Sequence, residues 1–291
     1  MTRSLFVAVG HDGLRSVSAD GKNWEPSQFG KEGEIYRAAA VGNGRAVAVG
    51  TYGGNNILAS TPDGKTWKVI QQDAKYAHYA RGLAFGDKRF VVVGGDPGAV
   101  GSGRPFVLIT ADGEKWDGPT EIVGKFIIRR IAYGNELWVG VGDRGRRAAS
   151  KDAKDWKDMP DIKAIDTLID IAFGNGVFVG VGLHGLRMRT VDGLKWTDRL
   201  VGDEGEHLNA IVWAKDRFVA VGAGATYTSP DGLKWERHAN TDAPTTVTFG
   251  DGVFLGPRWK GRLMRSTNAI RWEEVFKSDR HIEAVAWGDV G

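Results

Sequence analysis

Three arginines occupy the same register in three successive segments of the sequence. Arg37, Arg81 and Arg129 each lie two residues before the apolar part of a predicted strand. The other segments carry Ile169, Asn209, Thr245 and Glu283 in this column, and the next column adds Arg130 and Asp170. A guanidinium donates forked hydrogen bonds that match carboxylates, phosphates and sulfates. We therefore predict a site for an acidic ligand where these positions converge.

A second set of cations follows the next predicted strand of each segment: Arg15, Arg104, Arg144, Arg146, Arg147, Arg187, Arg189, Arg258, Lys260, Arg262 and Arg265. Trp259 lies among them outside the core register, and it is either an exposed contact residue or a ring folded onto the junction of the last and first segments. The predicted ligand-binding set is Arg37, Arg81, Arg129, Arg130, Asp170, Asn209, Glu283, Arg187, Arg258, Trp259 and Arg262. The alternative is that these cations pair with Asp12, Asp96, Asp143, Asp170 and Glu283 and only solvate a surface.

The sequence offers few of the residue combinations that catalysis or metal binding requires. A sialidase would use the arginines, Asp170, and Glu283 with Tyr36 or Tyr79, but no spacing pairs a Tyr with a Glu. Other glycosidases need two carboxylates about 5 to 9.5 Å apart, for which the strand starts offer Asp170 and Glu283. His207 and His281 share a column, with Ala243 between them in the intervening segment, and lone histidines are usually structural. We predict no catalytic residue, no metal and no cofactor.

A repeated tryptophan motif marks the groups of strands that must position these residues. A motif of the type Ser/Thr-x-Asp-Gly-x-x-Trp recurs every 37 to 49 residues and ends at Trp24, Trp67, Trp116, Trp156, Trp196, Trp235 and Trp272. The fourth motif has Ala153 in place of the Gly, and the seventh has Asn268 and Ala269 in place of Asp and Gly. That period accommodates four short strands with their turns, which predicts an all-β, seven-bladed β-propeller of four-stranded antiparallel blades. The Asp is expected to cap a turn and the Trp to pack between blades. One Asp in each motif does not make a calcium loop.

Runs rich in Val and Phe that end in Gly precede the Trp motifs and predict strands. In blade 6 the expected strands are Leu208–Trp213, Arg217–Gly222, Ala225–Ser229 and Leu233–Arg237. The chain begins inside a blade and ends in a lone strand, 282–288. We therefore expect the C-terminal strand to complete the N-terminal blade, which is composed of 1–28 and 281–291, within a single domain of residues 1–291.

Composition sets the remaining limits. The 291 residues are 42% hydrophobic, contain no cysteine and have a formal net charge of +3, and the expected protein is soluble and monomeric. This near balance does not favour general nucleic-acid binding, and no apolar run could span a membrane. The chain shows no signal peptide, so the compartment is open, and it is extracytoplasmic if Met1 replaces a removed leader. A glycine-rich insertion at 94–105 is expected to act as a lid or a partner contact.

The motifs Ser18–Trp24, Thr61–Trp67, Thr110–Trp116, Thr190–Trp196 and Ser229–Trp235 resemble Asp-box (bacterial neuraminidase) repeats, within propellers similar to the photosystem II assembly factor group. The resemblance covers nearly the whole chain. It implies a scaffold that holds other proteins. We thus expect a non-catalytic binding propeller whose Arg-rich central face holds an acidic protein segment or ligand. The alternative is a carbohydrate-active propeller, either lectin-like or hydrolytic.

Overall fold

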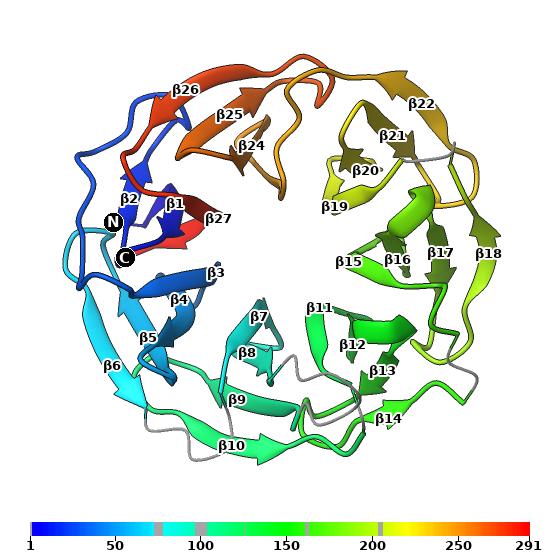
Figure 1. Ribbon diagram of the computed structural model, residues 1–291, viewed down its shortest axis with the longest axis horizontal. Coiled ribbons are helices and arrows are strands. Elements are labelled where there is room, and N and C mark those ends of the chain that lie inside the picture. The colour runs from blue at the N-terminus through cyan, green and yellow to red at the C-terminus, as the bar shows by residue number, and fades with distance from the viewer. Residues whose placement is uncertain (1, 73–77, 97–103, 125, 161–162, 203–205) are drawn as a thin grey trace.

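A computed structural model describes residues 2–72, 78–96, 104–124, 126–160, 163–202 and 206–291. Seven antiparallel sheets stand around a common axis (Figure 1), which confirms the predicted seven-bladed propeller. In blades 2 to 7 the chain forms each blade from the axis outwards, whereas in blade 1 the innermost strand comes last. Residues 97–103 of the predicted insertion lie outside the described part of the chain, as do residues 203–205.

In the order in which strands pair from the axis outwards, blade 1 contains β27 (Ile282–Val290), β1 (Arg3–Gly10) and β2 (Arg15–Ser18), and blade 2 contains β3 (Ile35–Gly42), β4 (Arg45–Tyr52), β5 (Asn55–Thr61) and β6 (Lys68–Gln72). Blade 3 contains β7 (Ala80–Gly86), β8 (Arg89–Gly94), β9 (Phe106–Thr110) and β10 (Asp117–Glu121). Blade 4 contains β11 (Ile128–Gly134), β12 (Leu137–Gly142), β13 (Arg147–Ser150) and β14 (Lys157–Asp158).

Blades 5 to 7 contain, in the same order, β15 (Leu168–Gly174), β16 (Val177–Gly182), β17 (Arg187–Thr190) and β18 (Thr197–Leu200); β19 (Leu208–Ala214), β20 (Arg217–Gly222), β21 (Ala225–Ser229) and β22 (Glu236–Ala239); and β23 (Thr248–Gly250), β24 (Val253–Arg258), β25 (Arg262–Ser266) and β26 (Glu273–Lys277). Two 3₁₀ turns, η1 (Asp143–Gly145) and η2 (Leu183–Gly185), follow the second strands of blades 4 and 5.

The ring closes through blade 1, as predicted. Strand β27 pairs with β1 along its length, from Arg3 opposite Val290 to Gly10 opposite Ile282. The outer strand of this blade is reduced to two isolated bridges, Ser18 with Trp24 and Arg15 with Gln28. Pro26 lies between these bridges and has no N–H to donate, which limits pairing there. The expectation of four full strands therefore fails in this blade.

The strands of blade 6 test the predicted boundaries. Two of them, β20 and β21, have the predicted ends, and β19 extends by one residue. The outer strand was predicted too early, because β22 begins at Glu236 rather than at Leu233. The amides of Leu233 and Lys234 donate to Oδ1 of Asp231, at 2.8 and 3.1 Å, and so belong to the capped turn.

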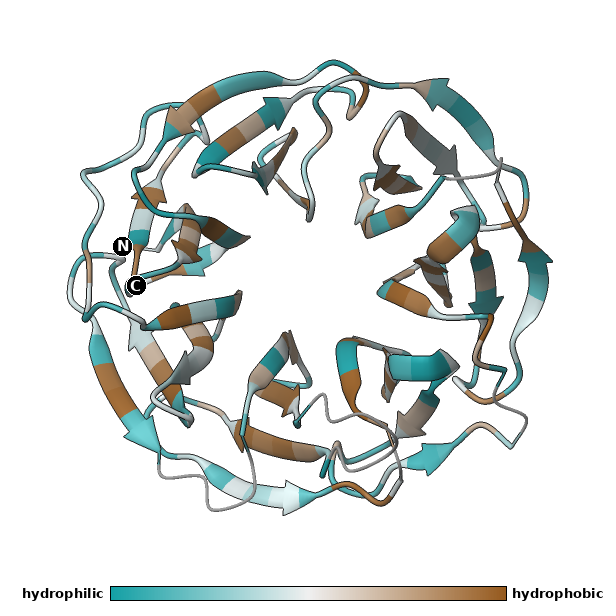
Figure 2. Cartoon of the chain, in the orientation of Figure 1, coloured by the Kyte–Doolittle hydropathy of each residue, from teal (hydrophilic) through white to brown (hydrophobic). Residues whose placement is uncertain are grey.

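Apolar side chains concentrate on the inner strands, whereas β14 and β22 on the outer edge are mainly hydrophilic (Figure 2). Aromatic residues of one inner strand lie against glycines of the preceding one. A Cβ on Gly134 would be 2.2 Å from the ring of Phe173, and a Cβ on Gly174 would be 2.1 Å from Trp213. Neighbouring blades therefore pack closely, with an aromatic ring of one blade against a glycine of the preceding blade.

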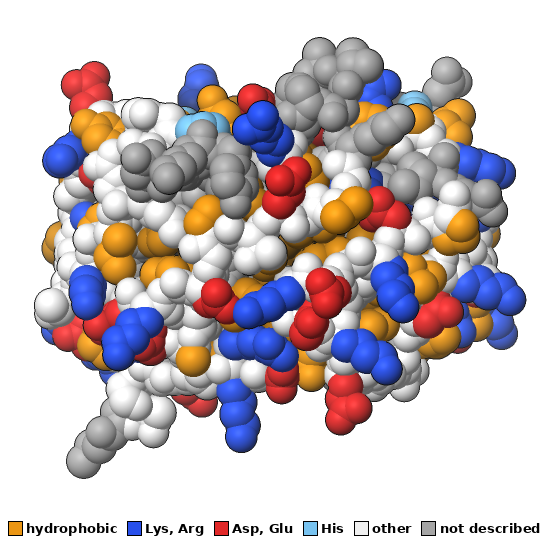
Figure 3. All heavy atoms as spheres, turned by 90° about the horizontal axis from the view of Figure 1, so that it is seen from below, with side chains coloured by type: hydrophobic (Ala, Val, Ile, Leu, Met, Phe, Trp, Pro, Cys, Tyr) orange, Lys and Arg blue, Asp and Glu red, His pale blue; other side chains and the backbone are white. Residues whose placement is uncertain are grey.

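The outer wall of the ring carries intermixed cations and carboxylates on the side seen in Figure 3. One such group joins neighbouring blades: Glu114 accepts from Arg45 at 3.1 Å and from Lys68 at 2.7 Å. Among the residues that the structure describes, no helix has the length and hydropathy needed to cross a membrane.

Candidate functional site

The predicted column of strand-start residues is a repeated β-bulge. In six blades the pairing of the inner strand with the second strand shifts by one residue at this position. A bulge inserts one unpaired residue and re-aims its side chain, and such sites are common next to binding sites. The bulged residues are Glu283, Arg37, Arg81, Arg129, Ile169 and Asn209 in blades 1 to 6. We call the end of the axis where the inner strands begin the mouth.

A glycine at the end of each second strand permits the bulge. A Cβ on Gly94 would be 2.3 Å from the carbonyl oxygen of Tyr79, so only a glycine allows this approach. The corresponding distances to a backbone oxygen are 1.8 to 2.1 Å at Gly10, Gly50, Gly142, Gly182 and Gly222. Blade 7 has Pro257-Arg258 in this register. Its inner strand β23 is correspondingly short, and the Thr245 amide donates to the Pro257 carbonyl oxygen at 2.9 Å.

Two of the three bulge arginines are paired with carboxylates, one from the neighbouring blade 1 and one from the same blade. Arg37 lies 3.5 Å from Oε1 of Glu283, which also contacts Nε2 of His11 at 2.8 Å. The guanidinium of Arg129 binds Asp143, with Nη2 to Oδ2 at 3.1 Å. Both charges are therefore compensated within the ring.

Arg81 stands between these two pairs and differs from them. Within the described residues no carboxylate lies at ion-pair distance from it, and its buried Nε, like that of Arg37, has no hydrogen-bond partner. Its guanidinium lies 5.5 Å from the centre of the Tyr79 ring. Burial, followed by repulsion from Arg129 and Arg37, lowers the pKa of Arg81 to about 10. The charged form of Arg81 is thus less stable than that of an exposed arginine, although the side chain stays protonated at neutral pH.

Arg130 and Asp170 form a tie between inner strands. The guanidinium of Arg130 is 4.0 Å from Asp170 and donates to the Arg81 carbonyl oxygen at 3.1 Å. Asp170 in turn accepts the Ile211 amide at 2.9 Å, so the group joins blades 3 to 6. Burial raises the pKa of Asp170, with Arg130 and two backbone amides opposing the shift. These two residues hold the bulged strands beside one another, and Asn209 is the bulged residue two positions before Ile211.

Arg187 was predicted at the mouth, but the structure buries it between blades. It is 6% exposed, and its guanidinium lies 4.1 Å from the ring of Tyr227 and 5.7 Å from Trp235. Arg15 and Arg147 have the same register, three residues before the Ser of the motif, and lie over Trp67 and Trp196 of the next blade. This spacing is the sequence signal that could have separated stacked arginines from arginines at the mouth.

Arg258, Trp259 and Arg262 lie in and beside the turn between β24 and β25 of blade 7. Arg258 pairs with Asp242, and Arg262 pairs with Glu274. The Trp259 ring stacks on His281 at 5.3 Å between ring centres, yet it remains 69% exposed. Both interpretations of Trp259 therefore apply, because its ring covers the junction between blades 7 and 1 and is still largely exposed to solvent.

Two sets of residues named for the alternative chemistries are poorly suited to them. Tyr36 is fully buried, and burial raises the pKa of its hydroxyl, which does not suit a nucleophile. The histidines of the metal hypothesis lie in separate pairs, His207 with His184 and His281 with His11, at ring distances of 5.4 and 5.2 Å. In the described ranges no group of three or more His, Asp or Glu could hold a metal ion.

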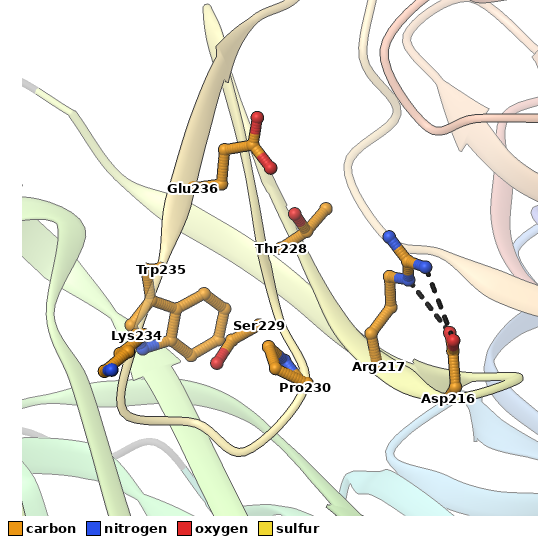
Figure 4. A pocket seen from close by; sticks show the side chains of 8 residues that line it. All are labelled: Asp216, Arg217, Thr228, Ser229, Pro230, Lys234, Trp235 and Glu236. Carbon is orange, nitrogen blue, oxygen red and sulfur yellow. Dashed lines mark hydrogen bonds and ion pairs between the residues drawn. The ribbon is translucent and has the colours of Figure 1, made fainter.

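A pocket of about 350 Å³ lies at the outer edge of blade 6 (Figure 4). Arg217 and Asp216 on its rim pair with each other at 2.9 Å, and Trp235 forms the opposite side. Since Trp235 donates to the Gly232 carbonyl oxygen at 3.0 Å, its polar atom belongs to the turn. The groups of this pocket therefore satisfy one another.

No family model matches the sequence, and a comparison with curated proteins gives no match. Solved structures do match. YCF48 bound to D1 peptide is 16% identical, with a TM-score of 0.65 over 90% of this chain and 85% of the other. YCF48 from Cyanidioschyzon merolae is 15% identical, with a TM-score of 0.58 over 89% and 87%. The computationally designed Ika8 protein is 12% identical, with a TM-score of 0.61 over 95% and 84%. At these identities the likeness establishes the propeller fold.

Proposed function

We propose that this protein is a non-catalytic scaffold whose mouth binds an acidic segment of another protein. The observation that carries the proposal is Arg81, which lies between two paired arginines and has no carboxylate at ion-pair distance among the described residues. A carboxylate placed against Arg81 restores the balance, and a charged hydrogen bond of this kind contributes about 1.5 to 3 kcal/mol. A peptide bound to a protein of similar fold supports a protein ligand over a small anion.

Arg37, Arg129 and Asn209 complete the proposed site as neighbouring bulge residues, and Trp259 adds an exposed aromatic surface on the same face. No chemistry is assigned to the mouth. Its two candidate acids already have partners, since Glu283 contacts His11 and Arg37, and Asp170 contacts Arg130 and the Ile211 amide.

The substitution Arg81→Gln tests the proposal. A dye-labelled peptide of alternating Asp and Leu, with both ends blocked, is titrated against the parent and the variant at low salt. We expect Arg81→Gln to weaken binding by about tenfold or more, as the loss of one charged hydrogen bond predicts. The melting temperature should hold or rise, because a cation that the fold disfavours has been removed.

The matched control is Arg217→Gln, which removes an exposed arginine that pairs with Asp216 at the opposite face. It should leave peptide binding within about twofold of the parent. Equal binding by parent and Arg81→Gln, or a fall in melting temperature that accounts for the loss of binding, would remove the basis of the proposal. In that case a glycan array would test the carbohydrate-binding alternative.

A further inference from the structure

A second groove lies on the face opposite the mouth, between blades 4 and 5. It has a volume of about 580 Å³ and is bounded by the turn before β12 and by the Asp-capped turn after β17. Two earlier junctions are bridged at this level by an arginine that begins the second strand: Arg45 donates to Asp112 and Arg89 to Asp152, both through backbone oxygens. Leu137 has that register in blade 4. An aliphatic side chain cannot make this bridge, and the two blades are joined here instead by Asn135, whose Nδ2 donates to the Gly176 carbonyl oxygen at 3.1 Å.

The floor of this groove is apolar. Leu137 and Ala149 come from blade 4, and Val191 and Leu194 come from the capped turn of blade 5. Val191 is 61% exposed, which is unusual for a β-branched side chain beside a concave surface. Burying one aliphatic side chain against such a floor contributes about 1.5 kcal/mol or more.

The rim of the groove is mainly acidic. It carries four carboxylates, Glu136, Asp152, Asp155 and Asp192, against the two lysines Lys151 and Lys157. The amides of Asp155 and Lys195 are the largest causes that lower the pKa values of Asp152 and Asp192 respectively. Both caps therefore remain ionised at neutral pH. The rim favours a cationic ligand, whereas the bulge arginines of the mouth favour an anionic one.

We propose that this groove binds an extended peptide segment of another protein in which an aliphatic residue is flanked by Lys or Arg. Side chains alternate along an extended chain, so the aliphatic residue faces the floor while its neighbours reach the carboxylates on the rim. The site is independent of the mouth. With both sites in use, the ring holds an acidic segment at one face and a basic, apolar segment at the other.

The test uses a dye-labelled peptide Lys-Leu-Lys-Leu-Lys with blocked ends and the substitution Val191→Lys. The new lysine removes an apolar contact and adds a like charge, so the dissociation constant should rise by about tenfold. The turn accepts the change, because Lys151 occupies the same motif position in blade 4. The matched control is Ala111→Lys, which places the same charge at the same position of blade 3, outside the groove, and should change binding less than about twofold.

Two further peptides separate the parts of the proposal. Replacing each Leu by Ser should weaken binding through the lost floor contact, and replacing each Lys by Glu should abolish it. Arg81→Gln should leave binding of the basic peptide unchanged, which separates this site from the mouth. The proposal is overturned if the parent does not bind the basic peptide, if the Ser peptide binds equally well, or if Ala111→Lys and Val191→Lys have the same effect.

Discussion

At the scale of single residues, the mouth depends on which arginine is left without a carboxylate. The sequence placed Arg37, Arg81 and Arg129 in one column, because the Gly-ended strands and the apolar runs set their register. It offered Glu283 and Asp143 as partners for the cations but could not assign them to Arg37 and Arg129, since these pairs depend on how the blades and the loops after the second strands pack. Nor could composition alone distinguish the buried Arg187 from an arginine at the mouth.

Gly94→Ala tests the bulge itself. Its Cβ would lie 2.3 Å from the Tyr79 carbonyl oxygen, so the start of β7 must move. We expect a loss of about 1 to 3 kcal/mol in the free energy of unfolding, typical of overpacking, together with weaker binding of the acidic peptide because Arg81 is the next residue after Ala80. Urea unfolding and peptide titration measure the two effects. Wild-type stability and affinity would show that the glycine is dispensable here.

At the scale of the element, the turn that precedes each motif Trp repeats one hydrogen-bond pattern. In blade 2, Oδ1 of Asp63 accepts the amides of Lys65 and Thr66 at 2.8 and 2.7 Å. Blade 7 keeps the pattern without the acid, since Oδ1 of Asn268 accepts two amides at 3.0 Å. The sequence therefore predicts the turn from spacing, and the element needs an oxygen acceptor rather than a charge.

The pH dependence of stability follows from these caps. Backbone amides lower the pKa values of Asp63, Asp112 and Asp192 in the folded state. Their contribution is therefore present above the unfolded pKa, near 4, and is lost as pH falls through the lower folded values. Replacing all three by Asn should leave stability at pH 7 nearly unchanged and should flatten its decline below about pH 4. Urea unfolding between pH 7 and pH 2.5 measures this.

The control for the caps is Asp251→Asn, in an exposed turn where other blades already carry Asn43, Asn135 and Asn175. It should not alter the acid limb of the stability curve. A triple Asn variant that declines as steeply as the parent would assign acid unfolding to other carboxylates.

At the scale of the whole molecule, repeats predicted the number of blades and the closure of the ring. They could not predict which junctions between blades carry a groove. The arginine bridge depends on one side chain at the start of a second strand, which is Arg in blades 2 and 3 and Leu in blade 4, where Asn135 joins the blades instead. The mouth was thus accessible to sequence reasoning through its register, whereas the groove between blades 4 and 5 was not.

Deleting the residues after Arg280 tests closure. Ile282, Ala286 and Val290 are buried in β27, and burying a large aliphatic side chain contributes about 1.5 to 3 kcal/mol. The loss approaches the 5 to 15 kcal/mol that stabilises typical domains. Circular dichroism should show that the cooperative melting transition disappears and returns when a peptide of residues 281–291 is added. An unchanged transition in the deleted protein would contradict the closure.

The antiparallel pairing of β1 with β27 also fixes where attachments can be made. Arg3 faces Val290, and the Gly291 amide donates to Gly44 in the turn between β3 and β4, at 2.8 Å. Both ends of the chain thus leave from the rim farthest from the bulge arginines. A sensor surface or a fluorescent fusion coupled through either end would leave the mouth directed toward solvent. It would obstruct ligand access to the groove between blades 4 and 5 before it obstructed the mouth.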